Sequence, residues 1–438
     1  MVVVLFKVGL ALAVGLLGAW TVRTRIMDMP ERQFRLAALA LQLVPALLLF
    51  VALYVVGHQE PTSDVPSYYI PAARATLAGK LPFRDFMVSY APGFPYVGAV
   101  LASVWNSGKV FALFAILVNA AALLWWHSAA GTCFSARATR ECTVLFATSG
   151  HVLVQALLGT SQAWVGAGLA ASALLMSRRQ ETGAGLVQAA AACTTKVLAH
   201  LFWPLLWICA QHRSRWLLAA AVPTALLYCV FVTMGAGSAL LYPLRFEGNL
   251  ISSGNLPYLL DLILGAAGHL ERAVDDGLAL AALAAATGWL YLKASTLPPR
   301  DRHTLLLVGL ACTGLVFMLF SKKSFTGYLL FVMYPVVLAL VTNTTGSWAR
   351  VGFLLFFNAA LVAEPTLWFR LQGDNISLRA WFATGSAATV VGFVLLDVAL
   401  VACYVYLGWL SVRGVDRIAD GASASTNASQ SATACSLV

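Results

Sequence analysis

Residues 36–56 read LAALALQLVPALLLFVALYVV and contain no charged side chain. A helix needs about 20 predominantly apolar residues to cross the hydrocarbon core of a bilayer, and this stretch is long enough. Similar apolar runs recur along the chain, at residues 2–20, 109–130, 142–158, 163–177, 216–234, 277–293, 304–320, 328–342, 351–368 and 381–410. The sequence therefore predicts an all-α fold, a polytopic bundle of transmembrane helices.

The composition excludes a soluble globular domain. Hydrophobic residues make up 60% of the 438 residues and charged residues only 11%, with a mean hydropathy of +0.81. The formal charge of +10 does not indicate a nucleic-acid partner, because the basic residues stand singly in short loops rather than in one cluster. The eight cysteines are scattered through apolar stretches, which favours packing roles over a disulfide framework or a zinc site.

Two stretches do not fit a single crossing. Residues 183–210 are too long for one span and short for two, so we expect a hairpin of two short helices with Lys196 near its turn. The stretch Pro92 to Trp105 is too short to cross, and we expect a juxtamembrane or re-entrant helix there. The expected total is about 11–13 membrane helices.

The chain is expected to form one transmembrane domain over residues 1–412. Its first apolar segment is predicted to be retained rather than cleaved, because a basic loop follows it where a signal peptidase would need small residues. Residues 57–108 form the first outside loop with its juxtamembrane helices. Residues 413–438, which include a run rich in Ser, Ala and Thr, are predicted to be a disordered cytoplasmic tail.

Loop charges predict the orientation. Lys and Arg accumulate in cytoplasmic loops, and one face carries about sixteen of them against about eleven on the other. The predicted cytoplasmic segments are 21–35, 136–141, 178–182, 211–215, 294–303, Arg350 and the tail after Ser411. The predicted outside loops are 57–91, 235–276, 321–327 and 369–380. The pattern fits the plasma (inner) membrane of a prokaryote or the endoplasmic reticulum of a eukaryote, where these loops face the lumen.

Charged and aromatic residues crowd into the first outside loop. Asp64 directly follows a helix exit, so it is expected near the bilayer boundary, with Tyr68 a few residues further on. An ionised carboxylate there is costly unless it has partners or a role. The alternative is an interfacial loop in which Asp64 caps the helix that runs to Ala78 and the tyrosines meet the lipid headgroups.

Several motifs, in this order, resemble the GT-C superfamily of membrane glycosyltransferases. The first is the run Gly79-Lys80-Leu81-Pro82-Phe83-Arg84-Asp85-Phe86, followed by Tyr90-Ala91-Pro92-Gly93. Later pieces are Gly159-Thr160-Ser161-Gln162, with two residues inserted between the family's Gly and Gln, the small-residue stretch Ala189 to Lys196, and Ser321 to Tyr328 followed by Met333-Tyr334-Pro335. The resemblance covers residues 36–342 and is closest to the polyprenol-phosphate-sugar-dependent mannosyltransferases and the aminoarabinose-transferase branch.

This resemblance implies transfer of a sugar from a polyprenyl-phosphate donor to a hydroxyl of a lipid, glycan or protein acceptor, on the outside or lumenal face. Such a single displacement needs one carboxylate base, for which Asp64 is the first candidate and Asp85 the second. Positive charge near the phosphate helps the lipid leave. The predicted substrate- and phosphate-binding residues are Tyr68, Arg84, Tyr90, Gln162, Lys196, Arg245, Lys322, Lys323 and Tyr328. Neither a cofactor nor an essential metal is expected, because acidic pairs are missing apart from Asp275-Asp276.

Each assignment has an alternative. Asp85 can simply pair with Arg84, Arg245 can pair with Glu247, and the lysines can extend from helix ends toward the interface. A transporter or lipid flippase would place charges within the spans, where Asp397 and Lys7 are the two that the sequence suggests. A non-catalytic subunit of a glycosylation complex would keep the fold without needing Asp64.

Overall fold

The computed structural model describes residues 2–62, 64–249, 251–264, 272–373 and 378–435. Its described helices, with η for 3₁₀ and π segments, are α1 (Val2–Thr21), η1 (Arg25–Asp28), α2 (Glu31–Phe50), η2 (Val51–Val56), η3 (Val65–Tyr69), α3 (Ile70–Leu77), α4 (Phe94–Val104), α5 (Lys109–Ala130), α6 (Ala136–Ala147), α7 (Gly150–Leu157), α8 (Gln162–Ser177), α9 (Glu181–Thr194), η4 (Val197–Phe202), α10 (Trp203–Cys209), α11 (Arg213–Thr233), η5 (Gly237–Leu240), α12 (Tyr242–Asn249), α13 (Leu256–Leu264), α14 (Arg272–Thr296), α15 (Arg302–Phe320), η6 (Thr326–Phe331), α16 (Met333–Asn343), α17 (Ser347–Leu371), α18 (Leu378–Thr384) and α19 (Ala387–Cys435).

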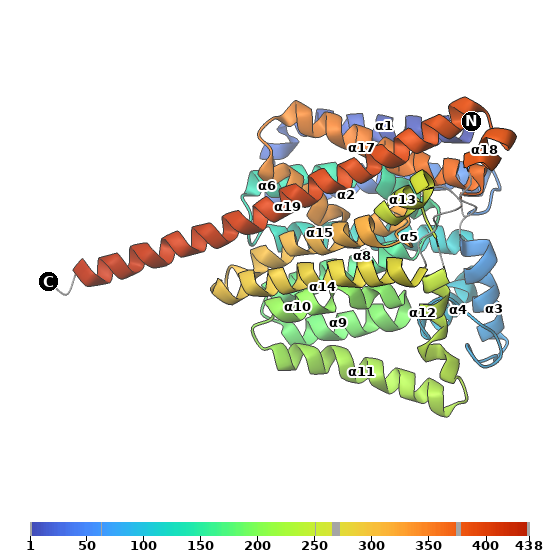
Figure 1. Cartoon of the computed structure of the whole chain (residues 1–438), viewed down its shortest axis with the longest axis horizontal. Coiled ribbons are helices and arrows are strands. Elements are labelled where there is room, and N and C mark those ends of the chain that lie inside the picture. Colours follow the sequence, from blue (N-terminus) through green and yellow to red (C-terminus); the bar gives the residue numbers. More distant parts are fainter. Residues whose placement is uncertain (1, 63, 250, 265–271, 374–377, 436–438) are drawn as a thin grey trace.

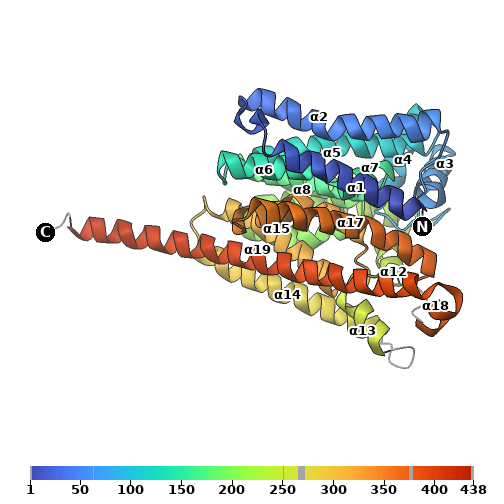
Figure 2. The same cartoon turned by 90° about the horizontal axis from the view of Figure 1, so that it is seen from above.

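Eight of the helices in the described part of the chain are long and apolar enough to cross a membrane. They are Val2–Thr21, Glu31–Val56, Lys109–Ala130, Arg213–Thr233, Val274–Thr296, Arg302–Phe320, Ser347–Leu371 and Ala387–Asp420. In Figures 1 and 2 the long helices lie roughly side by side, with α3, α12 and α18 at one end of the bundle. The predicted class is therefore confirmed as an all-helical, multi-pass membrane protein.

The remaining predicted spans are shorter or broken. The run 142–158, predicted as one crossing, is divided between α6 and α7. The break lies at Ser149, whose side chain accepts the N–H of Val152 and so caps α7. Asn358 of α17 accepts hydrogen bonds from the Ser149 hydroxyl and from the backbone of His151. The prediction of a single span was wrong here because polar partners outside the run satisfy a helix start that hydropathy does not reveal.

The predicted hairpin in residues 183–210 is confirmed. Helix α9 runs toward Lys196, and η4 with α10 runs back. The two outer ends of the hairpin meet, because the Glu181 carboxylate accepts the backbone N–H groups of Gln211 and His212. Lys196 is thereby placed at the turn, at the opposite end of the hairpin from Glu181.

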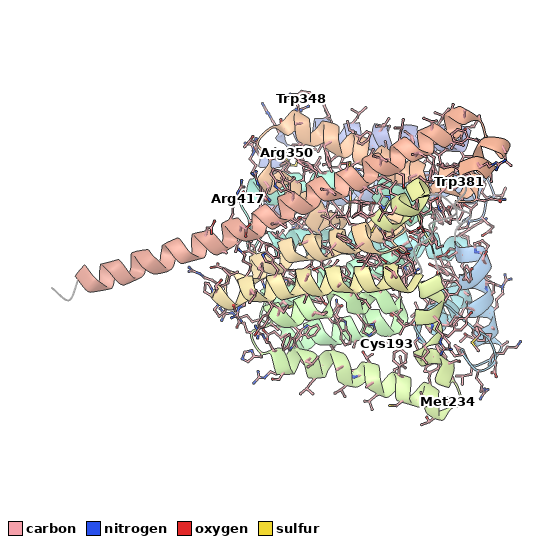
Figure 3. The ribbon with its side chains drawn as sticks, in the orientation of Figure 1. Cys193, Met234, Trp348, Arg350, Trp381 and Arg417 are labelled. Atoms are coloured by element: carbon pink, nitrogen blue, oxygen red, sulfur yellow. The ribbon has the colours of Figure 1, made fainter. Side chains whose placement is uncertain are left out.

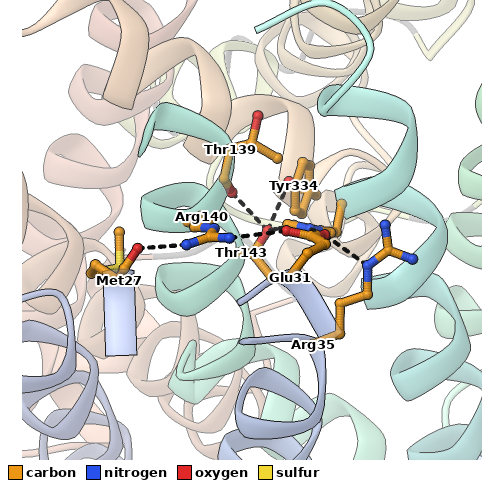
Figure 4. A network of polar contacts seen from close by, with 8 residues as sticks. Met27, Glu31, Arg35, Thr139, Arg140, Thr143 and Tyr334 are labelled. Atoms are coloured by element: carbon orange, nitrogen blue, oxygen red, sulfur yellow. Dashed lines mark hydrogen bonds and ion pairs between the residues drawn. The ribbon is translucent and has the colours of Figure 1, made fainter. Parts of the chain in front are cut away.

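One end of the bundle is tied together by a polar network that Figure 4 shows. The carboxylate of Glu31 contacts the ring of His127 (Oε1–Nε2 2.7 Å) and the guanidinium of Arg140 (3.2 Å). Arg140 also donates to the backbone oxygen of Met27, and the other ring nitrogen of His127 lies 2.9 Å from the Thr143 hydroxyl. The network joins the basic loop after α1 to α2, α5 and α6.

Other basic segments lie at this same end. Figure 3 places Trp348, Arg350 and Arg417 at the end from which α19 projects. Arg350 pairs with Glu141 (2.8 Å), and Arg417 donates to Asn343 (3.1 Å). The loops predicted to be cytoplasmic therefore gather at one end of the bundle, as the charge pattern indicates.

The predicted boundary at residue 412 is not seen in the backbone. Helix α19 continues past this residue to Cys435 and projects beyond the bundle (Figure 1). Past the boundary, Asp416 pairs with Lys293 of α14 (2.6 Å) and Arg417 reaches Asn343. These contacts extend the packed part of the helix beyond residue 412.

Candidate active site

The first feature of the site is the carboxylate of Asp64. The residue lies between η2 and η3 at the end of the bundle opposite the basic loops, and its side chain makes no capping hydrogen bond. Instead, Asp64 Oδ2 accepts the phenol of Tyr90 at 2.6 Å. Asp64 is partly exposed, whereas Tyr90 is only 3% exposed. The carboxylate is therefore held from the protein side by one short hydrogen bond, and helix capping does not account for it.

Tyr90 is fixed by backbone pairing with the turn of the α9–η4 hairpin. The N–H of Ala91 donates to Thr195 O (3.1 Å), and the N–H of Gly93 donates to Cys193 O (2.8 Å). A Cβ at position 93 would lie 2.7 Å from Cys193 O, which is closer than side-chain carbons normally approach. The glycine of the Tyr-Ala-Pro-Gly motif thus lies where its backbone meets the backbone of Cys193. This contact brings Tyr90 next to Lys196.

Lys196 lies between two tyrosine rings. Its ammonium is 4.9 Å from the ring centre of Tyr90 and 4.8 Å from that of Tyr328, and it donates to the Tyr328 hydroxyl at 3.1 Å. The side chain is 5% exposed. Four of the predicted site residues are therefore joined in one cluster: Asp64, Tyr90, Lys196 and Tyr328.

The sequence analysis missed Tyr69 and Ser161, which support this cluster. The Tyr69 hydroxyl lies 3.0 Å from Ser161 Oγ and accepts the N–H of Ser161, and its ring packs edge-on against Tyr90. Burial raises the pKa of Tyr69 to about 12 and holds the pKa of Tyr90 well above its ordinary value. Both phenols are therefore neutral at physiological pH, and Tyr90 can donate to Asp64.

The position of Tyr69 leaves a weak signal in the sequence, since it follows Val65 by one helical turn and shares its buried side. Ser161, by contrast, belongs to the two residues that depart from the Gly-Gln pattern. That departure supplies the contact to Tyr69. Gln162, the next residue, is buried at the start of α8, and its Oε1 has no hydrogen-bond partner.

An apolar groove begins beside the cluster. Its volume is about 650 Å³, and it runs between α4, α5, α8 and α9. Thr194 and Thr195, directly before Lys196, line one end, and Arg178 lines the other. The remaining walls are Val97, Phe114, Val118, Ala121, Trp125, Trp164, Ala167, Gly168, Ala171, Leu174, Leu175, Val187, Ala190 and Ala191. The groove thus ends at Thr195, next to Lys196 in the chain, and runs from there toward the opposite end of α8 along an almost wholly apolar path.

The contacts of Asp85 all lie outside this cluster. It pairs with the neighbouring Arg84 through two bonds of 2.9 and 3.0 Å and accepts the N–H of Leu81. The hydrogen bonds from Arg84 are the main reason that its pKa falls to about 2. Asp85 is therefore an ionised surface carboxylate that already has a partner. This agrees with the alternative in which Asp85 and Arg84 form an ion pair within the loop.

The late basic loop has acidic partners. Lys322, only 3% exposed, lies 3.2 Å from Asp276, and Lys323 lies 3.8 Å from the same carboxylate. Asp275 is buried beside them, with Oδ1 lacking a hydrogen-bond partner. These carboxylates offset the positive charge that was expected to attract a phosphate.

The two other predicted binding residues lie near each other at the surface. Tyr68 is exposed and packs edge-on against Phe246 of α12, and Arg245 is exposed on the same helix. Glu247, the expected partner of Arg245, has a side chain outside the described residues. Among the side chains that the structure describes, no hydrogen bond, ion pair or ring contact joins Tyr68 or Arg245 to Asp64.

Comparison with known proteins gives no match: no protein-family model, no curated protein and no solved structure corresponds significantly to this chain.

Proposed function

We propose that this chain is a membrane glycosyltransferase that moves a sugar from a polyprenyl-phosphate donor to an acceptor hydroxyl. The observation that carries the proposal is the position of the Asp64–Tyr90–Lys196–Tyr328 cluster at the head of a long apolar groove. A carboxylate, an ammonium and a lipid-sized channel are the three elements that such a transfer uses. The motif order that resembles the GT-C superfamily points the same way.

In this proposal Asp64 is the general base. Its carboxylate takes the proton of the acceptor hydroxyl while the acceptor oxygen forms a bond to the anomeric carbon of the sugar. The bond between that carbon and the phosphate oxygen breaks, and its electron pair leaves with the polyprenyl phosphate. Tyr90 holds the carboxylate from behind, so the other oxygen is left for the acceptor.

Lys196 is the residue that meets the phosphate. A leaving phosphate needs no general acid, but positive charge stabilises it as the bond breaks. The ammonium lies against two ring faces and a phenol, surroundings that orient it. Tyr328, hydrogen-bonded to Lys196, is a second group within reach of the same phosphate.

The groove accounts for the lipid part of the donor. From Trp164 to Arg178, the residue that follows α8, the groove runs along fifteen residues, which is about 21 Å of helix. An isoprenoid chain that enters beside Thr195 can lie along this wall with its phosphate at Lys196. A soluble sugar nucleotide would have no use for such a channel.

The proposal is tested by substituting Asp64 with Asn in the full-length protein. Transfer from radiolabelled polyprenyl-phosphate sugars should fall by about a hundredfold to ten-thousandfold, because an amide cannot accept the proton. Asp85→Asn is the matched control and should keep most of the activity. Full transfer by the Asp64 variant would remove the assignment, and loss in the Asp85 variant alone would move the base there.

The same assay separates the two alternatives. A non-catalytic subunit would show no transfer in the wild type with any donor. A lipid flippase would move the polyprenyl phosphate across vesicles without breaking its glycosyl bond.

A further inference from the structure

Two carboxyl groups lie in the middle of the second half of the bundle. Asp397 of α19 is completely buried, and Glu364 of α17 is 2% exposed. The sequence analysis named Asp397 as a charge within a span but omitted Glu364, which lies within the predicted span 351–368. An ionisable side chain at such a depth is expensive, so its partners need to be identified.

Both carboxyls bind the same short loop between α12 and α13. The hydroxyl of Ser253 donates to Glu364 Oε1, and the N–H of the next residue, Gly254, donates to Asp397 Oδ1. Because the two acceptors meet adjacent residues, Glu364 and Asp397 lie within electrostatic range of each other. They form a single acidic pair that faces the loop.

The described part of the chain supplies no positive charge to this pair. No Lys, Arg or His of the described residues is within ion-pair distance of either carboxyl; Lys7, which packs on α17, donates to Thr366 instead (3.4 Å), and Lys322 contacts Asp276. Asp397 Oδ2 and the completely buried hydroxyl of Tyr404 have no hydrogen-bond partner. Tyr404 follows Asp397 by two helical turns on α19 and interacts electrostatically with both carboxyls.

Two ionised carboxylates cannot share an apolar interior without compensation, since an unpaired buried charge strongly destabilises the folded protein. One positive charge lowers the net charge of the pair from two negative charges to one, and a single buried carboxylate can be stabilised by hydrogen bonds. The orphaned oxygens of Asp397 and Tyr404 show where a further donor or a cation would find unused acceptors.

We propose that Glu364 and Asp397 form a binding site for one monovalent cation, taken up as a proton or as Na⁺. Asp397 Oδ2 and the Tyr404 hydroxyl complete the site. Occupancy holds the Ser253–Gly254 turn between α17 and α19. The turn continues into the late basic loop, because the N–H of Ser252 donates to Lys322 O at 2.8 Å. Cation binding therefore fastens the loop that carries Lys322 to the helices behind it.

The experiment is thermal unfolding of the full-length protein in detergent, from about pH 5 to about pH 9, first without Na⁺ and then with Na⁺ added. If the folded protein holds a proton that the unfolded chain releases, stability falls as the pH rises. Relative to Asp397→Asn, the wild type should lose about 2–4 °C in Tm over this range without Na⁺. If the Tm at high pH stays low when Na⁺ is added, the occupant is a proton. If added Na⁺ restores the Tm, the occupant is the metal ion.

Glu364→Gln is the second variant and should remove the same dependence if Asp397→Asn does not fold. The matched control is Glu141→Gln, a buried carboxylate whose partner is the guanidinium of Arg350 (2.8 Å), a group that does not titrate in this pH range. The Tm of this control should differ between low and high pH by as much as the Tm of the wild type does. The proposal would be overturned if Tm changed with pH and with Na⁺ by the same amount in the wild type, in Asp397→Asn and in Glu364→Gln.

Discussion

Replacing Tyr90 with Phe removes one hydroxyl from the candidate site and changes little else. The Phe ring keeps the contacts with Tyr69, Phe94 and the ammonium of Lys196, which depend on the ring rather than on the oxygen. What is lost is the 2.6 Å hydrogen bond to Asp64. Hydrogen bonds to charged groups contribute about 1.5–3 kcal/mol, and 1.4 kcal/mol corresponds to a tenfold change in rate or affinity. If the bond positions Asp64 for proton transfer, the rate should fall by about 10- to 150-fold.

The measurement is the turnover of polyprenyl-phosphate sugar by purified protein, with thermal stability recorded in parallel. Tyr69→Phe is the matched control, because it removes a buried tyrosine hydroxyl whose hydrogen bonds are to Ser161. This control should lower the thermal stability and leave turnover less affected than Tyr90→Phe does. Equal turnover in Tyr90→Phe and the wild type, with wild-type stability, would refute the positioning role of this hydroxyl. Equal losses in both tyrosine variants would show that the effect comes from packing.

Three further predictions follow from the same geometry. Lys196→Gln should weaken binding of polyprenyl phosphate by about tenfold or more, whereas the Lys322→Ala/Lys323→Ala double variant should bind nearly normally, as measured by lipid competition. Gly93→Ala should cost about 1–3 kcal/mol in unfolding free energy and most of the transfer, because its new Cβ meets Cys193 O. Since the pKa of Asp85 is about 2, this carboxyl is ionised across the working pH range, and Asp85→Asn should leave the pH–rate profile unchanged.

The class of the fold could be predicted because a bilayer imposes its thickness on every crossing. Long uncharged runs such as 36–56 and 109–130 leave no other choice. The prediction failed where polar side chains inside the bundle form hydrogen bonds that stabilise a helix end. Ser149 and Asn358 break the run 142–158 into two helices, and neither residue interrupts the hydropathy enough to show it. Interior partners of this kind are separated by some two hundred residues and leave no local pattern.

The candidate site could be predicted in part for a similar reason. Asp64 and Lys196 stand next to the ends of apolar segments, so their depth in the membrane follows from the sequence. Tyr69 and Ser161 do not stand out, because a buried tyrosine and a loop serine are common. Their roles depend on a contact between segments far apart in the chain.

The clearest limit of sequence reasoning concerns the lysines. Lys196, Lys322 and Lys323 were all expected on the outside face as phosphate ligands, and by hydropathy they are equivalent. Their surroundings differ: Lys322 and Lys323 share a carboxylate with each other, whereas Lys196 lies on two aromatic faces beside a lipid-sized groove. An anion that approaches the late loop must first displace Asp276 from the two lysines. The tertiary partners of a basic residue, rather than its position along the chain, therefore decide whether it can serve an anionic substrate.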